Sequence, residues 1–443
     1  MPPRVREESR AVAPKVSPIA RRSHIRDRRA STAPTLAMFG LGSLYRNLVF
    51  ATEGYTHYLA PAFASKKLPQ LPETSLVGAH IIVTGANQGI GYATAKALFA
   101  RGATVHMVCR DEARGAAAMK RMEQELGAPR GGALELHVAD LSSLSQTRHL
   151  VERYTSSGKP LHALVCNAGV MQHERTYTSE GFEYNFAVNT LMTQVLQAGL
   201  RPVLGRTAAD ESNLPQNVER KYYTPRVVVV SSAGMLTESL AVTDLEMRKT
   251  SRFDGTKQYA RGKRHQVALC ERWARLEAEN VGSERIASGK GYVGFYSMHP
   301  GWVETSGVQN ALPKFYESMK NKLRSVEQGA DTVLFLLLED ASQLKPGAFY
   351  FDRKPVSKHI TGGFTKAKPE VVDKLALELD NLATRASVHG EHSQRGVRKS
   401  PSFKSSLRNS PSGTLRNSPS GSSLRATNSQ TKVDSEGEDA SKP

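Results

Sequence analysis

The stretch VTGANQGIG, residues 83–91, links an apolar run to the start of a helical pattern. We predict a buried strand over His80–Val83 and a helix that begins directly after the stretch. Gly85 then permits a tight turn, Gly89 lets the backbone approach a ligand, and Gly91 lets the helix pack close to the sheet. Because unpaired amides at the start of a helix favour an anion, this loop is predicted to bind a pyrophosphate.

The same alternation of strand and helix continues toward the C-terminus. Further strands are predicted at Thr104–Val108, Leu134–Val138, Leu161–Val165, Val227–Val230, Tyr292–Met298 and Phe349–Phe351. Helices are predicted at Tyr92–Arg101, Arg114–Leu126 and Ala260–Ala278. Most of these strands are apolar on both faces, which indicates a parallel sheet covered by helices on both sides. The predicted fold class is α/β, a doubly wound, Rossmann-type sheet of seven parallel strands.

Two basic, polar segments flank this region. The chain has 443 residues and a formal charge of +18, of which residues 1–35 contribute +6 and residues 385–443 contribute +5. We predict disordered tails over 1–35 and 384–443, because neither has enough apolar surface to offset the entropy of ordering a chain. A nucleic-acid binder more often carries its positive charge on the folded part, so nucleic acid is not an expected partner. Between the tails we expect a helical extension, 36–77, and the main domain, 78–383.

The segment 36–62 is the most apolar part of the chain outside the predicted main domain. Its apolar residues recur at helical spacing, which indicates an amphipathic helix. This helix packs on the folded body, lies in a membrane interface or shapes a substrate entrance, and the sequence leaves these interpretations open. Residues 1–35 also have a composition that is typical of organelle transit peptides. We expect a cytoplasmic protein, with organelle targeting or a peripheral membrane location as alternatives.

The cysteine content and the hydropathy exclude several classes of protein. The three cysteines, Cys109, Cys166 and Cys270, are too few and too scattered for a disulfide framework or a zinc site. We therefore expect a reducing compartment and no structural metal. There is no uninterrupted apolar run of about 18 residues, which argues against a membrane-spanning helix.

Polar residues follow successive predicted strands. The segments that contain them are Arg110, then Asp140-Leu141, then Asn167-Ala168-Gly169, and then Ser231-Ser232. The carboxyl ends of parallel strands meet at one edge of a sheet, so these residues predict a ligand site there. Arg110 favours a 2′-phosphate, and hence NADP over NAD, through a charge-assisted bond. The adjacent Asp111 weakens this inference, and the alternative is that Arg110 is only a solvated residue at a helix start.

Tyr259 and Lys263 are four residues apart on a predicted helix. This spacing places the phenol and the ammonium on one face, where the cation would lower the pKa of the tyrosine. A tyrosine with a lowered pKa is a usable acid or base near neutral pH. Tyr316/Lys320 and Tyr350/Lys354 have the same spacing, but Tyr350 lies on a predicted strand and Tyr316 follows the sixth strand. Only Tyr259 lies on a helix that returns it to the edge where Ser232 lies.

The motifs described above, taken in their order along the chain, resemble those of the short-chain dehydrogenase/reductase family. The resemblance extends from Gly78 to Asp352, and its motifs are TGANQGIG, Asp140, CNAG, Asn189, VVSSAG, the Tyr259/Lys263 pair and HPGWVET. Within the family, the stretches FDGTKQYARGKR and SMHPGWVET are most similar to the member 12 group.

The resemblance implies an NADP(H)-dependent oxidoreductase that interconverts an alcohol and a carbonyl. In such an enzyme Tyr259 transfers the proton, Lys263 lowers the Tyr259 pKa and bonds the nicotinamide ribose, and Ser232 binds the substrate oxygen. Asn189 matches the asparagine that holds a water in a proton relay. The residues implied to bind the cofactor are Gly85, Asn87, Gln88, Gly89, Ile90, Gly91, Arg110, Asp140, Leu141, Asn167, Ala168, Gly169, Tyr259, Lys263, Pro300, Gly301, Val303 and Thr305.

The segment from Thr305 to Arg324 is expected to cover the substrate. Its apolar residues favour a lipophilic substrate, with ordinary helix packing as the alternative; they are Leu312, Phe315, Tyr316 and Met319. A polar insertion between Leu204 and Arg226 is expected to lie on the surface.

A second function is a catalytically weak, NADP(H)-binding sensor or scaffold that acts through its tails. A homo-oligomer, a membrane contact through 36–62 and a protein partner of the tails are further expectations.

Overall fold

The computed structural model describes residues 68–396, except for 128–130, 211, 213–223, 361 and 363. The predicted helix over 36–62, the N-terminal tail and most of the C-terminal tail lie outside these residues, as does most of the predicted insertion. Those expectations stay predictions. Within the described part of the chain, no helix is both long and apolar enough to cross a membrane.

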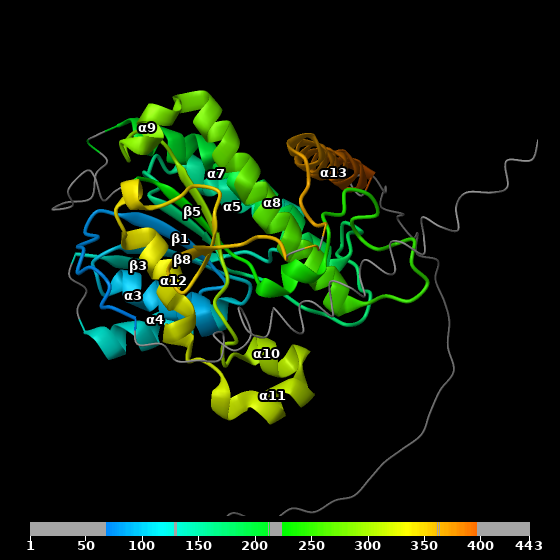
Figure 1. Ribbon diagram of the computed structural model, residues 1–443, viewed down its shortest axis with the longest axis horizontal. Coiled ribbons are helices and arrows are strands. Elements are labelled where there is room, and N and C mark those ends of the chain that lie inside the picture. Colours follow the sequence, from blue (N-terminus) through cyan, green and yellow to red (C-terminus); the bar gives the residue numbers. More distant parts are fainter. Residues whose placement is uncertain are drawn as a thin grey trace, which may run out of the picture. The chain divides into compact units, whose positions relative to one another are not determined.

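The described strands form one sheet in the order β3-β2-β1-β4-β5-β6-β7-β8 (Figure 1). They are β1 His80–Thr84, β2 Thr104–Cys109, β3 Ala133–Val138, β4 Ala163–Cys166, β5 Arg226–Val230, β6 Gly294–Met298, β7 Phe349–Phe351 and β8 Lys354–Val356. Neighbours from β3 to β7 pair in parallel, and β8 pairs with β7 in the antiparallel direction.

The predicted doubly wound α/β sheet is confirmed, but it has eight strands and not seven. The strand that sequence analysis missed, β8, is only three residues long and contains Pro355. Proline is tolerated at such a position because an edge strand leaves backbone amides without a ladder partner.

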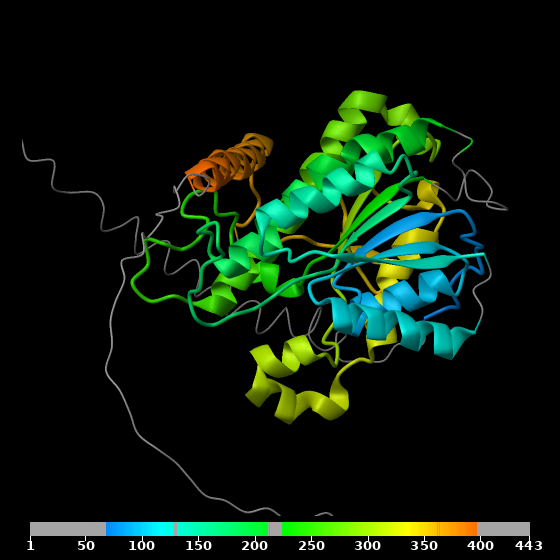
Figure 2. The same ribbon diagram turned by 180° about the vertical axis from the view of Figure 1, so that it is seen from behind.

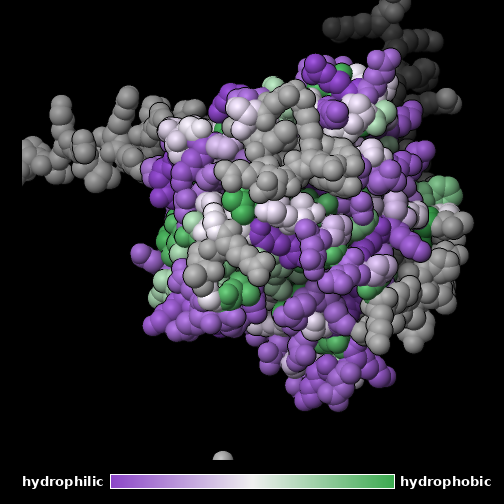
Figure 3. Space-filling view, turned by 90° about the vertical axis from the view of Figure 1, so that its left-hand side faces the viewer, coloured by the Kyte–Doolittle hydropathy of each residue, from purple (hydrophilic) through white to green (hydrophobic). Residues whose placement is uncertain are grey.

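Helices pack on both faces of the sheet, as Figures 1 and 2 show from opposite sides. The helical segments are α3 Gly89–Phe99, α4 Glu112–Leu126, α5 Leu144–Ser156, α6 Tyr184–Phe186, η2 Ala187–Leu191, α7 Met192–Ala209, η5 Ala233–Thr237, α8 Gly255–Val281, α9 Ser283–Ala287, α10 Ser306–Ala311, α11 Pro313–Met319, η6 Lys320–Lys322, α12 Val326–Leu338, η7 Ala341–Gln343 and α13 Pro369–Gly396. One apolar core joins the sheet to α3, α4 and α12, and the other joins it to α5, α7 and α8. The face drawn in Figure 3 is mostly hydrophilic, with hydrophobic side chains scattered over it.

The glycine-rich loop adopts the conformation that the sequence predicts. Gly85 has a φ of +66°, in the left-handed region that favours glycine. A Cβ on Gly91 would overlap the carbonyl oxygen of Gly85, so the close packing assigned to Gly91 is confirmed. The Asn167 side-chain amide donates to the Thr84 carbonyl oxygen at 2.8 Å and ties β4 to the start of the loop.

Helix α13 continues to Gly396, past residue 383, where the main domain was predicted to end; the domain boundary itself stays a prediction. Leu375, Ala376 and Leu379 of α13 are fully buried in the core that contains α5, α7 and α8. Asp373 of the same helix accepts hydrogen bonds from Arg272 and Arg275 of α8. The sequence did not predict the last turns of α13, because the composition after Thr384 is polar and the apolar stripe of the helix ends just before it.

The burial of α13 generates a stability prediction. Leu379→Ala should lower the free energy of unfolding by about 2–5 kcal/mol, because it leaves a cavity in the core. Leu377→Ala is the matched control, since Leu377 of the same helix is 61% exposed and its truncation should change stability by less than about 0.5 kcal/mol. Urea unfolding followed by circular dichroism measures both, and equal effects would show that α13 does not pack as described.

Candidate active site

A cavity of about 870 Å³ lies beyond the carboxyl ends of β1, β2, β4, β5 and β6. Ser232, Tyr259 and Lys263 line it, together with every residue predicted to bind the cofactor except Gly91. Gly91 and Asn189 lie directly behind the wall. A Cβ on Gly91 would meet Gly85, and one on Gly169 would lie 3.2 Å from the Asn189 Oδ1 atom. The structure thus brings all the predicted site residues to one edge of the sheet.

Two reciprocal hydrogen bonds fix α8 to the end of β5. The Lys263 Nζ atom donates to the Val230 carbonyl oxygen at 2.8 Å, and the Ser231 hydroxyl donates to the Lys263 carbonyl oxygen at 2.9 Å. The next residue after Ser231 is Ser232, and Ser232 and Tyr259 both line the cavity, with the serine hydroxyl close enough to the phenol to lower its pKa. Sequence analysis identified Ser232 and Tyr259 as neighbours, and the clamp between α8 and β5 is the reason that they meet.

The expected lowering of the Tyr259 pKa is wrong for this structure. Removal of the phenol from bulk water is the largest influence, and it raises the pKa of Tyr259 to about 12, although part of the side chain faces the cavity. The neighbouring Ser232 hydroxyl lowers the pKa of Tyr259 but does not compensate. A phenol with a raised pKa keeps its proton at neutral pH and is therefore a proton donor there.

Lys263 does not act on the phenol as the spacing predicted. Its Nζ atom bonds to Val230 and lies 5.4 Å from the centroid of the Tyr259 ring. Burial lowers the pKa of Lys263 itself to about 8, because the ammonium is removed from water. The same burial that raises the pKa of the phenol thus lowers that of Lys263, which stays mostly charged at neutral pH.

Asn189 lies on η2, a π-helical turn between α6 and α7, and is fully buried. Its side chain makes a reciprocal pair of bonds with the backbone of Val170, at 2.9 Å and 2.8 Å. The backbone carbonyl oxygen of Asn189 accepts hydrogen bonds from the side chains of Gln266 and Thr193. Asn189 thus fixes the loop that follows β4, and its role in a water relay stays a prediction.

At the end of the cavity next to β2 and β3, Arg110 donates to the Tyr184 hydroxyl at 3.0 Å. The Asp111 carboxylate accepts from the Arg114 amide at 2.9 Å and so caps α4. The Arg114 side chain also lines the cavity. Neither Arg114 nor Tyr184 was predicted from the sequence. Arg114 lies four residues after Arg110, and this spacing could have identified it.

At the other end, α10 forms part of the cavity wall. Thr305 caps this helix by accepting from the Val308 amide. The His173 Nε2 atom lies 2.6 Å from the Ala311 carbonyl oxygen and joins α10 to the loop after β4. Apolar side chains in this region of the wall include Met171, Val188, Trp302 and Leu312.

Of the four apolar residues predicted to face the substrate, only Leu312 lines the cavity. Phe315 instead packs against Trp302 in a tilted arrangement with ring centroids 4.4 Å apart, and the Tyr316 hydroxyl donates to Glu304. The alternative of ordinary helix packing therefore applies to Phe315 and Tyr316. The selection of Tyr259 over the other two tyrosines agrees with the structure, since neither Tyr316 nor Tyr350 lines the cavity.

The donor groups and the shape of this cavity fit a dinucleotide. A side chain at Gly91 would overlap Gly85, and α3 begins at Gly89, which lines the cavity together with Gln88 and Ile90. The first amides of a helix have no partner within it and favour an anion such as a pyrophosphate. The cavity volume lies within the range of small-molecule sites.

Comparison with known proteins agrees with this geometry. Residues 79–208 match the family model described as short chain dehydrogenase. The chain is 40% identical over 345 residues to human dehydrogenase/reductase SDR family member 12, covering 77% of this chain and 98% of that protein. It is 35% identical over 188 residues to zebrafish polyprenol dehydrogenase, covering 42% and 52%.

Among solved structures, an uncharacterized protein from Mycobacterium paratuberculosis matches with a TM-score of 0.50 and 24% identity, over 71% of this chain and 96% of that one. This likeness supports the fold alone. The predicted similarity to the member 12 group is confirmed. The chain belongs to the short-chain dehydrogenase/reductase family, whose members are oxidoreductases that act on CH–OH groups with NAD(P).

Proposed function

We propose that this enzyme uses NADP(H) to interconvert an alcohol and a carbonyl on a small, lipophilic substrate. The observation that carries the proposal is that Ser232, Tyr259 and Lys263 lie together on the wall of one cavity. A bound nicotinamide supplies or accepts the hydride. The residues of this chain position the substrate oxygen and move the proton.

In the direction of reduction, the Tyr259 phenol donates its proton to the carbonyl oxygen as negative charge develops there. The Ser232 hydroxyl donates to the same oxygen and stabilises that charge. At neutral pH the phenol holds the proton that this step requires, although its raised pKa makes it a weaker acid. Alcohol oxidation requires the phenolate and should be slower near neutral pH than at alkaline pH.

Lys263 holds the geometry of the pair and provides the positive charge nearest to the reacting groups. Its bond to Val230 fixes the face of α8 that carries Tyr259. With a pKa of about 8, Lys263 is mostly charged at neutral pH. An ammonium at this position would bond the hydroxyls of the nicotinamide ribose, as the family resemblance implies.

The preference for NADP(H) rests on the charges next to α4. Arg110 and Arg114 both line the cavity and offer guanidinium groups to a 2′-phosphate. The carboxylate of Asp111, which would favour a free 2′-hydroxyl, is engaged in capping α4 and lies 3.6 Å from the Arg114 side chain. The residue that weakened the inference from sequence is therefore occupied elsewhere.

The lipophilic character of the substrate rests on the wall near α10, where Met171, Trp302 and Leu312 line the cavity. The zebrafish relative is named polyprenol dehydrogenase, and a polyprenol is an apolar alcohol. The alternative function, a sensor that acts through the tails, concerns residues outside the described part of the chain. The cytoplasmic location and the homo-oligomer also stay predictions.

The role of Tyr259 is tested by substitution. Tyr259→Phe removes only the hydroxyl, and kcat/KM for the reduction of a panel of lipophilic ketones and aldehydes with NADPH should fall about 100- to 10,000-fold. Tyr316→Phe is the matched control, because Tyr316 has the same spacing to a lysine but lies outside the cavity wall. Equal turnover by the wild type and Tyr259→Phe would refute the assignment.

The cofactor preference is tested at Arg110. Arg110→Gln should weaken NADPH binding about 10- to 100-fold, since a charge-assisted bond to the 2′-phosphate is lost, and should change NADH binding by less than about twofold. Lys120→Gln makes the same change of charge at an exposed site on α4 that does not line the cavity. Fluorescence titration of reduced cofactor measures both, and a parallel loss of NADPH and NADH affinity would contradict a role in selecting the phosphate.

A further inference from the structure

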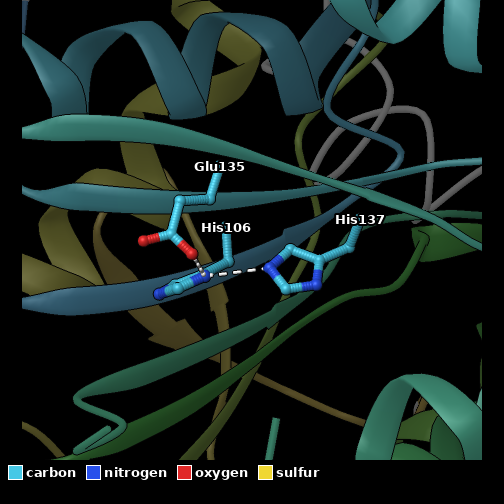
Figure 4. Close-up of side chains that lie close together, drawn as sticks. All are labelled: His106, Glu135 and His137. Carbon is cyan, nitrogen blue, oxygen red and sulfur yellow. Dashed lines mark hydrogen bonds and ion pairs between the residues drawn. The ribbon is translucent and has the colours of Figure 1, made fainter. Parts of the chain in front are cut away.

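A second group of ionisable side chains lies outside the cavity, on β2 and β3. His106 and Glu135 are register partners on these neighbouring strands, and His137 lies two residues farther along β3, on the same face as Glu135. Figure 4 shows that Glu135 and His137 both point toward the ring of His106. None of the three lines the cavity, and nothing in the proposed catalytic function uses them.

The distances between the facing atoms are those of a ligand set. The His106 Nδ1 atom lies 3.0 Å from His137 Nε2 and 3.3 Å from a Glu135 carboxylate oxygen. One ligand atom from each of the three residues lies within 4.8 Å of the others. Around a tetrahedral ion with bonds of about 2.0–2.1 Å, adjacent ligand atoms are separated by about 3.3–3.4 Å, so only small side-chain movements are needed.

We propose that His106, Glu135 and His137 bind a divalent transition-metal ion of the zinc type, which joins β2 to β3. Two imidazoles and one carboxylate are a donor set that suits zinc, whereas calcium and magnesium prefer oxygen ligands. The site departs from the sequence-based expectation of no structural metal, which considered only the cysteines.

The surroundings of His106 support its role as a ligand through Nδ1. Its other ring nitrogen, Nε2, lies 3.0 Å from the His80 Nδ1 atom. An N–H at Nε2 that donates to His80 leaves the lone pair of Nδ1 for the metal, which is the usual arrangement around metal-binding histidines. The ring also packs edge-on against Tyr154 of α5, with centroids 4.9 Å apart, so its orientation is fixed.

The site is reachable from solvent. His106 is buried, but Glu135 is about one-third exposed and His137 is partly exposed. A metal held by the three side chains would keep its fourth position for a water molecule, which is the pattern of a site with an open coordination position.

The ammonium group of Lys159 competes with a metal ion for the Glu135 carboxylate. Its Nζ atom bonds both carboxylate oxygens of Glu135, at 2.7 Å and 2.9 Å. Because the Lys159 side chain is 38% exposed, it can leave the carboxylate for solvent when a metal binds. The proposal therefore makes two predictions of opposite sign: removal of Lys159 should tighten metal binding, and removal of a ligand should weaken it.

The test is calorimetric titration of the full chain with ZnCl₂, after treatment with a chelator and without a polyhistidine tag. The wild type should bind zinc with a one-site transition that His137→Ala and Glu135→Gln each weaken at least about tenfold. Lys159→Gln should bind zinc more tightly than the wild type, because the competing ammonium is gone. His149→Ala is the matched control, since His149 is an exposed histidine of α5 outside the cluster, and it should bind like the wild type.

The variants replace only the two partly exposed ligands, because truncation of the buried His106 would disturb the core. Circular dichroism verifies that each variant folds. Co²⁺ provides a second readout, since its visible absorption should report coordination in the wild type and weaken in His137→Ala. The absence of saturable zinc binding, or equal binding by His137→Ala and the wild type, would overturn the site. Lys159→Gln binding no tighter than the wild type would remove Glu135 from the ligand set and overturn the three-ligand assignment.

Discussion

The contact between α8 and the end of β5 is the constraint on which the active site depends. Lys263 donates to the carbonyl oxygen of Val230, and Ser231 donates to that of Lys263. These two bonds connect Val230 and Ser231, at the end of β5, to α8, the helix that carries Tyr259. They add to the packing of Leu269, Cys270 and Trp273 of α8 in the core that also contains β5, and together these contacts set where Tyr259 lies relative to Ser232. The packing of one helix on one strand thus places the pair that we propose to react.

Burial sets the protonation of this pair. It raises the pKa of Tyr259 to about 12 and lowers that of Lys263 to about 8, which disfavours the charged form in both cases. Both shifts favour the uncharged form, which is the protonated phenol for Tyr259 and the neutral amine for Lys263. The site by itself is therefore suited to donating a proton to a developing alkoxide. Removal of a proton from an alcohol would require additional positive charge close to the phenol.

Much of the fold could be predicted because its elements carry strong local signals. The strand after Gly78 and the one at Thr104 are short apolar runs, and the structure extends each by a single residue. The carboxyl-end residues could be predicted as one site because parallel strands end at a common edge. In contrast, β8 has only three residues, and the last turns of α13 have a polar composition, so neither had a detectable pattern.

The parts of the site that could not be predicted depend on side-chain surroundings. The pKa of Tyr259 is set by burial, which the spacing to Lys263 does not reveal. Phe315 packs against Trp302 and does not line the cavity, which depends on how α11 packs. His106 and His137 meet only because β2 and β3 pair in one register. A motif search that begins from cysteines does not find such a pair.

The most direct test of the account is a double-mutant cycle on Ser232 and Tyr259. The values of kcat/KM for carbonyl reduction with NADPH are measured for Ser232→Ala, Tyr259→Phe and the double variant. If the two hydroxyls act on one oxygen as a unit, the double variant should be little worse than Tyr259→Phe, so that the two losses are strongly non-additive. Losses that simply multiply would show that the two hydroxyls act independently and would contradict the central claim.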